Sequence, residues 1–151
     1  MRVGDNLEEI GAVYDLTGSG DAMAFRTSTP VRVVRWGMIS STAIVGTSAV
    51  LALDQTTHEA DASVTRTDAV GTTVLTIPAN AGIGQVFYCE PTTEVLLKPG
   101  DILHIDGTTV IGTSGSAYPF IQYQKLNWDD TGANANYSDA TPTSRMTNGS
   151  T

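Results

Sequence analysis

Residues 31–39, Val-Arg-Val-Val-Arg-Trp-Gly-Met-Ile, form the stretch of sequence that decides the fold. β-Branched and aromatic residues dominate it, and such residues are enriched in strands because they pack well on a pleated surface. Trp36 alternates with Val34 and Met38, and a period of two places these three side chains on one face. We therefore predict a strand whose Trp36 lies in the core or at an interface.

Similar short runs follow along the chain. Residues 44–53 end in Val-Leu-Ala-Leu and carry apolar side chains on both alternating faces, which is typical of a strand covered on both sides. Further candidate strands are residues 62–66, 73–77, 85–90, 94–97, 102–105 and 119–126. Turn residues separate them at 78–82, at 98–101 (Lys-Pro-Gly-Asp) and at 106–107 (Asp-Gly). Eight or nine short strands predict an all-β, jelly-roll-like antiparallel β-sandwich.

The two ends of the chain differ from this middle part. Residues 11–29 are rich in Gly, Ser and Asp, and residues 127–151 hold almost no aliphatic side chains. A segment of that kind buries too little apolar surface to offset the entropy of ordering, so we expect neighbouring chains to hold it. We predict an N-terminal arm over 1–30, a β-sandwich over 31–126 and an extended C-terminal arm over 127–151. Asp5 to Ile10 fits one helical turn, with Asp5 as the cap.

Charge and composition restrict the partners. The chain of 151 residues has a formal net charge of −8, and its only lysines are Lys98 and Lys125. Phosphate backbones and anionic membranes attract clusters of Lys and Arg, so we expect no direct nucleic-acid or membrane binding. The N-terminal stretch lacks the apolar run of a signal peptide, and the single Cys89 fits a reducing compartment. We therefore expect synthesis in the cytoplasm.

No residue pattern amounts to an active site or a metal site. His58 is expected in a solvated loop with Glu59 and Asp61, and His104 is expected on a strand with an ordinary partner. Residues 130–132, Asp-Thr-Gly, match the triplet of aspartic proteases, but one copy in a polar tail favours a plain turn. Cys89 follows three apolar residues and is expected to be an inert, buried thiol. We predict a protein that is not an enzyme and needs no metal or cofactor.

The remaining candidates are interface residues. Trp128, Tyr137 and Met146 are the sizeable apolar side chains of the C-terminal arm, and Arg145 is its only cation. Aromatic residues and Met are enriched at interfaces, so we expect these three to dock the arm. Arg145 would pair with an acidic patch such as Asp5, Glu8 and Glu9. Trp36 is the interface candidate outside the arm.

Three segments carry a family resemblance: residues 31–37 (VRVVRWG), 73–78 (TVLTIP) and 95–101 (VLLKPGD). Over about residues 12 to 126 the chain resembles the small virion structural proteins of tailed bacteriophages, most of all their capsid decoration, or cement, proteins. The resemblance implies a jelly-roll-like domain, often a homotrimer, made in the host cytoplasm. Such a protein sits on the outer capsid surface, where it bridges adjacent subunits of the major capsid protein.

Two other functions remain open at this point. The first is a receptor- or carbohydrate-binding module of a tail fibre or tailspike, in which Trp36 or Trp128 would stack on a sugar ring, assisted by Tyr118, Tyr123 or Tyr137. The second is another virion connector, such as a head-completion or tail-terminator protein. Copy number separates the connector from a decoration protein, since a connector forms a single ring.

Overall fold

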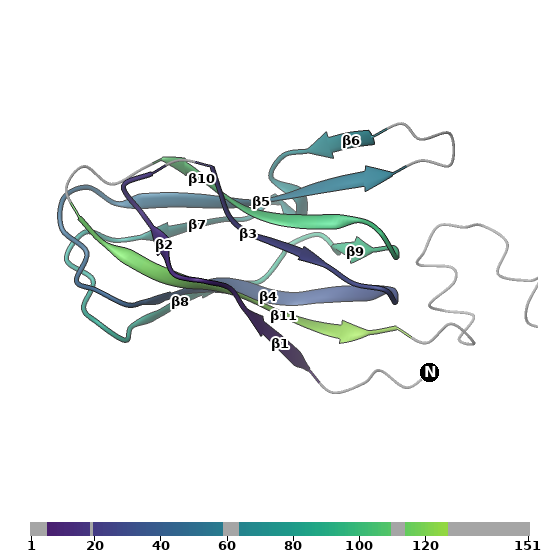
Figure 1. The fold of residues 1–151 in the computed structure, drawn as a ribbon, viewed down its shortest axis with the longest axis horizontal. Helices are drawn as coiled ribbons and strands as arrows, with labels where there is room; N and C mark the ends of the chain where they lie inside the picture. Colours follow the sequence, from purple (N-terminus) through teal and green to yellow (C-terminus); the bar gives the residue numbers. More distant parts are fainter. Residues whose placement is uncertain (1–5, 19, 59–63, 110–113, 127–151) are drawn as a thin grey trace, which may run out of the picture.

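The computed structural model describes residues 6–18, 20–58, 64–109 and 114–126, and these residues form a two-layered β structure. Figure 1 shows the two layers, with β5, β7 and β10 in the upper one and β1, β4, β8 and β11 in the lower one. The strands are β1 (Leu7–Ile10), β2 (Tyr14–Asp15), β3 (Gly20–Arg26), β4 (Val31–Ser40), β5 (Ala49–His58), β6 (Val64–Thr67), β7 (Val74–Ile77), β8 (Val86–Cys89), β9 (Leu96–Leu97), β10 (Ile102–Thr109) and β11 (Ser116–Lys125). A short 3₁₀ turn, η1, covers Val70–Thr72.

The strand order is that of a jelly roll. The first sheet has the order β1-β11-β4-β8, with β2 also paired to β11 and β9 to β4. The second sheet has the order β3-β10-β5-β6, with β7 also paired to β5. All these pairs are antiparallel. Consecutive strands cross between the sheets: β3 lies in the second sheet, β4 in the first and β5 again in the second. Nested crossings of this kind define the double Greek key of a jelly roll. The predicted fold class is confirmed.

The N-terminal segment belongs to the sandwich. The described part of residues 1–30 contains three strands, with β1 paired to the last strand, β11, and β3 paired to β10. Met23 and Phe25 alternate toward the interior and are buried in the core. The prediction of an arm over this segment is wrong because these side chains supply enough buried apolar surface to order it. The predicted helical turn is wrong as well, since Leu7–Ile10 is a strand.

A bulge in β4 corrects the alternation expected around Trp36. Arg35 pairs with Gln122 and Val33 pairs with Tyr123, so Val34 is an extra residue between two consecutive pairs. A bulge of this kind reverses the side-chain alternation of its strand. Val31 and Val33 therefore point inward before the bulge, whereas Trp36 and Met38 point inward after it. Val34 does not share the face of Trp36.

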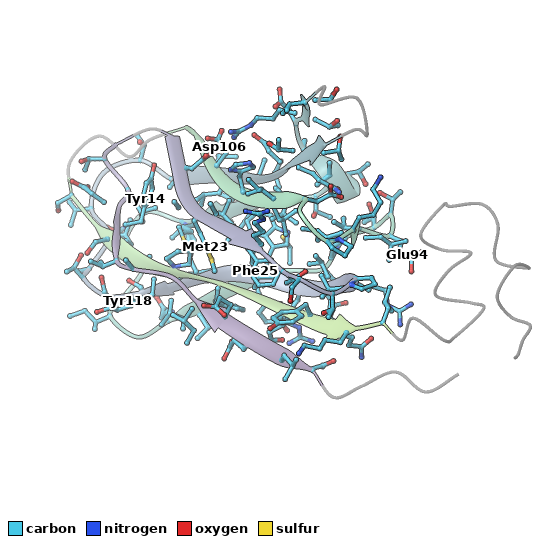
Figure 2. The ribbon with its side chains drawn as sticks, turned by 45° about the vertical axis from the view of Figure 1, so that its right-hand side comes forward. Tyr14, Met23, Phe25, Glu94, Asp106 and Tyr118 are labelled. Carbon is cyan, nitrogen blue, oxygen red and sulfur yellow. The ribbon has the colours of Figure 1, made fainter. Side chains whose placement is uncertain are left out.

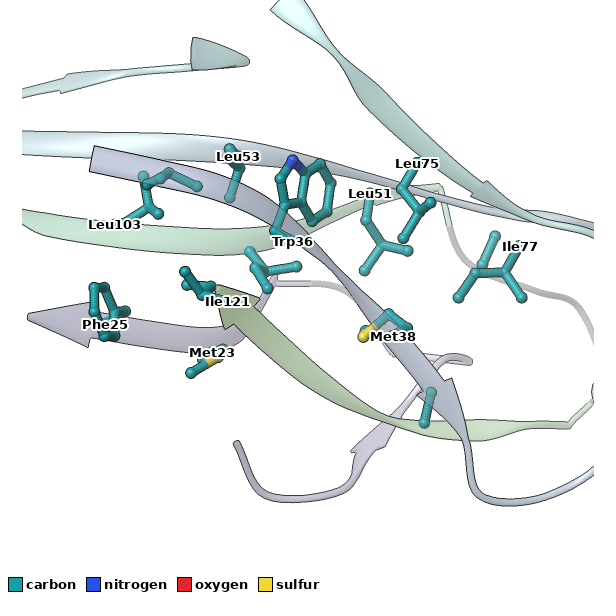
Figure 3. Packing of buried hydrophobic residues seen from close by; sticks show 14 of the residues in the cluster. Met23, Phe25, Trp36, Met38, Leu51, Leu53, Leu75, Ile77, Leu103 and Ile121 are labelled. Atoms are coloured by element: carbon teal, nitrogen blue, oxygen red, sulfur yellow. The ribbon is translucent and has the colours of Figure 1, made fainter. Parts of the chain in front are cut away.

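The core lies between the two sheets. Trp36 is 0% exposed and packs among aliphatic side chains of both layers (Figure 3). The fully buried residues around it come from β4, β5, β7, β10 and β11, and include Met38, Leu51, Leu53, Ile77, Leu103, Ile105 and Ile121. Burial of Trp36 confirms its core role and removes it as an interface residue and as a sugar-stacking residue.

Of two turns that the sequence predicts, one is confirmed and the other is wrong. The Lys98–Asp101 turn is confirmed: the amide of Asp101 donates to the carbonyl oxygen of Lys98 at 3.0 Å, and Gly100 has φ +96°. The Asp101 carboxylate also accepts from the Lys98 amide at 3.1 Å. The expected turn at Asp106-Gly107 is wrong, because β10 continues through both residues between β3 and β5. Strand pairing on both sides overrides the turn preference of Asp-Gly.

Candidate interaction surface

An apolar patch covers half of the outer face of the first sheet. Cross-strand partners share a face, so the register defines its rows. One row holds Tyr118, Ile39 and Val86, and the next holds Ile10, Phe120, Gly37 and Tyr88. We call Ile10, Ile39, Val86, Tyr88, Tyr118 and Phe120 the outer patch. Figure 2 shows Tyr118 and Asp106 on opposite sides of the sandwich, with Met23 and Phe25 between the layers.

The outer patch is exposed over most of its area. Ile10, Val86, Tyr88 and Tyr118 are between 42% and 54% exposed. Single exposed apolar residues are ordinary on protein surfaces, whereas a contiguous group on one sheet face is a candidate interaction surface. The patch spans four neighbouring strands, and its residues come from positions 10 to 120. Only the folded chain brings them together.

Phe120 and Gly37 form the floor of the outer patch. Phe120 is 2% exposed although it lies on the outer face, because its ring covers Gly37 of the neighbouring strand. A Cβ atom at Gly37 would lie 2.9 Å from Phe120 Cζ and would also meet the carbonyl oxygen of Phe87. Glycine at this position therefore allows β8 to approach β4 and allows the Phe120 ring to pack directly on the main chain of Gly37.

Charged side chains occupy the other half of the same sheet face. Arg35 pairs with Glu90 at 3.0 Å and lies over the Tyr88 ring, with its Cζ 4.5 Å from the ring centroid. Arg32 pairs with Glu94 at 3.2 Å. These are exposed pairs, worth at most about 1 kcal/mol each. Each pair is neutral by itself, and Glu8 of β1 and Asp15 of β2 add two negative charges to the same sheet face.

A second polar region lies on the outer face of the second sheet, around His104. The Nδ1 atom of His104 is 2.9 Å from Asp21 Oδ2, and its Nε2 atom is 2.9 Å from Thr56 Oγ1. The expected strand position and ordinary partner of His104 are confirmed. The order hydroxyl, imidazole, carboxylate also occurs in hydrolases, where catalysis further requires an oxyanion site and a substrate cleft. Two shallow surface grooves, beside Pro99 and beside Met23, do not include Thr56.

Arg66 of β6 connects this region to the rest of the second sheet. Its guanidinium lies 2.8 Å from Asp21 Oδ1 and 2.8 Å from Asp54 Oδ2. The Asp54 carboxylate is almost completely buried and also accepts from the Ala69 amide at 2.9 Å. Burial by itself would raise the pKa of Asp21, but the hydrogen bond from Arg66 and the charges of His104 and Arg66 lower it on balance. The network therefore ties the β5–β6 hairpin to β3.

Asp106 and Asp21 have opposite pKa shifts. Burial raises the pKa of Asp106, and the charges of Asp54 and Asp21 add to the rise against the opposing effect of Arg66. Burial and the nearby carboxylates also raise the pKa of Tyr14, whose hydroxyl donates to the Gly18 and Gly20 carbonyl oxygens. The chemistry of this region is that of a cross-strand ionic network that holds four strands together.

The structure places the other sequence candidates as follows. Trp128, Tyr137, Arg145 and Met146, the aspartic-protease triplet and the whole predicted C-terminal arm lie outside the described residues. His58 ends β5, whereas the sequence predicts a loop for it. Tyr123 faces inward, with its ring centroid 4.9 Å from that of Phe25, so it does not offer a stacking face. Tyr118 is exposed.

Cys89 lies on the inner side of β8. It is half-buried against the core, and this burial raises the pKa of its thiol. A weak contact with Thr73 Oγ1 at 3.8 Å lowers the pKa by less than burial raises it. A raised thiol pKa agrees with the predicted inert packing role.

Sequence reasoning missed the outer patch, although a signal for it was present. Residues 86–89, Val-Phe-Tyr-Cys, are apolar on both alternating faces, as in a strand covered on both sides. One face, with Phe87 and Cys89, packs on the core, and the other, with Val86 and Tyr88, is exposed. Four consecutive apolar residues therefore indicated that both faces of this strand are apolar, but only the fold shows that one of the two faces is exposed.

Comparison with known proteins assigns this chain to no family. No family model and no curated protein matches this chain. A solved structure of the Eiger TNF from S. frugiperda matches with 17% sequence identity and a TM-score of 0.36. The match covers 68% of this chain and 61% of that chain, so this chain spans less than two thirds of its length.

Two further observations concern the described residues alone. None of their helical segments has the length and hydropathy needed to cross a membrane. No group of three or more His, Cys, Asp or Glu side chains among them is arranged to hold a metal ion.

Proposed function

We propose that this protein is a non-enzymatic structural protein of an assembly and, within that class, a capsid decoration protein of a tailed bacteriophage. The outer patch is the observation that carries the first part, because a contiguous exposed apolar surface on a sheet face is typical of a surface that packs against another protein. The resemblance of residues 31–37, 73–78 and 95–101 to virion structural proteins supports the second part.

In this proposal the β-sandwich is a rigid block that contributes contact area. Its apolar surface is buried against other subunits, and each square ångström removed from water contributes about 25 cal/mol. The C-terminal segment, with Trp128, Tyr137 and Met146, binds the major capsid protein. Many weak contacts repeated around a shell add up through multivalency. The acidic charge of the chain fits the outer capsid surface, away from the packaged DNA.

The proposal is tested on virions that lack the protein. We expect depleted capsids to release DNA, or to rupture, at lower temperature than complete ones, and we expect added purified protein to restore the difference. DNA release is followed with an intercalating dye during heating. Depleted particles that retain their genome as well as complete particles do would refute the cement function.

Carbohydrate binding is the second candidate, and one observation favours it. Arg35 lies over one face of the exposed Tyr88 ring and pairs with Glu90, and the other ring face together with these hydrogen-bonding groups suits a sugar ring. Binding to host surface polysaccharide on a glycan array, abolished by Tyr88→Ala, would establish this function. The connector function stays a prediction. Counting the copies of the protein in each particle tests it, since a connector forms a single ring.

A further inference from the structure

We infer that one end of the sandwich, where β3 and β11 end and β4 and β10 begin, docks onto carboxylate groups of a protein partner. Under the proposed function, on which this inference rests, the partner is an acidic surface segment of the major capsid protein. Figure 1 shows these strand ends together on the right-hand side of the sandwich. We call Arg26, Lys98 and Lys125 the basic end.

The basic end holds the cations that the described residues leave without an ion pair. The other arginines of the described strands, Arg32, Arg35 and Arg66, all pair with carboxylates. The two lysines of the basic end are the only lysines in the whole chain. In a chain with a net charge of −8, the unpaired positive charge of the described part therefore lies in one place.

The loop of residues 27–30, between β3 and β4, brings two of these cations together. Arg26 ends β3 and directly precedes the loop. The Thr27 carbonyl oxygen accepts a hydrogen bond from the Gly100 amide at 3.4 Å, so the Lys98–Asp101 turn lies against the loop. A surface groove runs between the loop and this turn, and Arg26 is one of its walls.

The third cation, Lys125, lies on the other side of the same loop. Its neighbour Leu126 donates from its amide to the Pro30 carbonyl oxygen at 2.9 Å. Lys125 pairs across the sheet with Val31, which pairs in turn with the residue before Lys98. Two strand spacings amount to about 10 Å, so one short segment of a partner can contact both lysines.

The groove suits a carboxylate. Arg26 and Ser28 are exposed beside Pro99 and Gly100, and Lys125 is exposed as well. A guanidinium group binds a carboxylate through two parallel hydrogen bonds, and a serine hydroxyl can donate one more. Lysine contributes a point charge with three donors.

The carboxylates of this end are already bound within the fold. Asp101 is 2% exposed and accepts from the Lys98 amide at 3.1 Å and from the Gln55 side chain at 3.3 Å. Glu94 pairs with Arg32 at 3.2 Å. The exposed charge that a partner meets here is therefore positive.

Other acidic side chains lie further away. Glu8 and Glu9 pair in register with residues three and four positions before Lys125, which corresponds to about 10 Å or more along β11. Asp68 follows β6, and β6 is separated from β3, which carries Arg26, by β10 and β5. The Debye length at physiological salt is about 8 Å, so these charges are largely screened from a short segment bound at the basic end.

The same charges select a protein segment over a nucleic acid. A few cations neutralise only a few phosphates, and the acidic remainder of the chain repels a long polyanion. A folded acidic partner offers its carboxylates locally. Residues 127–151, which bind the capsid protein in our proposal, follow Leu126 at this end, so both contacts can fall on one capsid subunit.

Sedimentation of the full chain with depleted capsids tests the inference. At about 0.1 M salt, where the Debye length is about 10 Å, neutralising the basic end with Arg26→Gln, Lys98→Gln and Lys125→Gln should raise the dissociation constant about tenfold or more, since each exposed pair contributes up to about fivefold. Added salt should weaken binding of the parent more than binding of this triple variant.

Two controls separate a local contact from net charge. Val74→Glu lowers the net charge by one, as Lys125→Gln does, but it lies on β7 at a side chain that is 56% exposed. We expect Lys125→Gln to weaken binding and Val74→Glu to leave it unchanged. Equal binding of parent and triple variant, or equal loss in both single variants, overturns the inference.

Carbodiimide cross-linking identifies the partner atoms, because this reagent joins a lysine amine to a carboxylate. We expect Lys98 and Lys125 to couple to acidic residues of the major capsid protein. The double variant Lys98→Arg, Lys125→Arg keeps both charges, so it should still bind and lose these cross-links. Cross-links from the two lysines to acidic residues of this chain alone overturn the inference, as does retardation of duplex DNA that the triple variant abolishes.

A capsid-free measurement separates this inference from the decoration function. A labelled hexaglutamate peptide should bind the parent in fluorescence anisotropy and bind the triple variant about tenfold more weakly or less. A parent that binds the peptide but not capsids refutes the decoration function and the capsid partner, and leaves the carboxylate site standing. A parent that protects capsids without binding the peptide, or a triple variant that protects them equally well, refutes the basic end alone.

Discussion

Replacement of Gly37 by alanine is the sharpest test of how the first sheet is built. The added Cβ would meet the carbonyl oxygen of Phe87, and it would lie 2.8 Å from Tyr88 Cα and 2.9 Å from Phe120 Cζ. The first two are main-chain atoms of β8, which pairs with β4 at this point. A side chain can rotate away from such a contact, but a paired strand has to move as a whole.

The expected cost follows from these contacts. Overpacking costs about 1–3 kcal/mol, and an obstacle made of main chain favours the upper end of that range. Alanine regains about 0.5–1 kcal/mol because it restricts the unfolded chain more than glycine does. The net loss of unfolding free energy is about 2 kcal/mol. In a domain of this size that lowers Tm by about 4–8 °C.

Thermal and urea unfolding of the full chain measure this loss. Gly82→Ala is the matched control, since the nearest atom to its added Cβ is Gln85 Oε1 at 3.7 Å, and we expect its stability within about 0.5 kcal/mol of the parent. Adding Phe120→Leu to Gly37→Ala should not restore stability, because the Phe87 carbonyl remains in place. Unchanged stability in Gly37→Ala, or full rescue by Phe120→Leu, would show that the strands do not approach as described.

Two further predictions concern titratable groups. The folded pKa of Asp106 is raised above its ordinary value of 3.8, so its ionisation opposes folding at neutral pH and ceases to do so below that value. Asp106→Asn should therefore stabilise the protein near pH 7 by less than about 1 kcal/mol, with no gain below pH 3.8. Asp21 has a lowered pKa, so its ionised form stabilises the fold, and Asp21→Asn should destabilise the protein at pH 7. Urea titrations across pH check both signs, and equal signs would contradict the network. Because burial raises the pKa of Cys89, its thiol should react slowly with iodoacetamide at neutral pH and faster in urea; rapid labelling of the folded protein would contradict its inner position.

Local sequence patterns predicted the strands well where β-branched runs end in turn residues. Residues 73–77 and 85–90 contain β7 and β8, and the Pro-Gly-Asp turn precedes β10 as expected. The failures occur where strand pairing overrides a local preference. Asp106-Gly107 has the composition of a turn and lies in the middle of β10. Residues 5–10 have a helix-capping pattern, yet residues 7–10 form β1.

The sequence by itself determined that this chain is a Thr- and Gly-rich, acidic β-sandwich, because branched side chains, alternation and turn chemistry act within a few residues. Tertiary structure alone decided which faces meet. One extra residue at Val34 reverses the side of β4 on which Trp36 lies, and only sheet pairing brings Ile10, Tyr88 and Phe120 into one patch. The physical reason is that register and bulges are set by the partner strand, which is distant in sequence, so no local window contains that information.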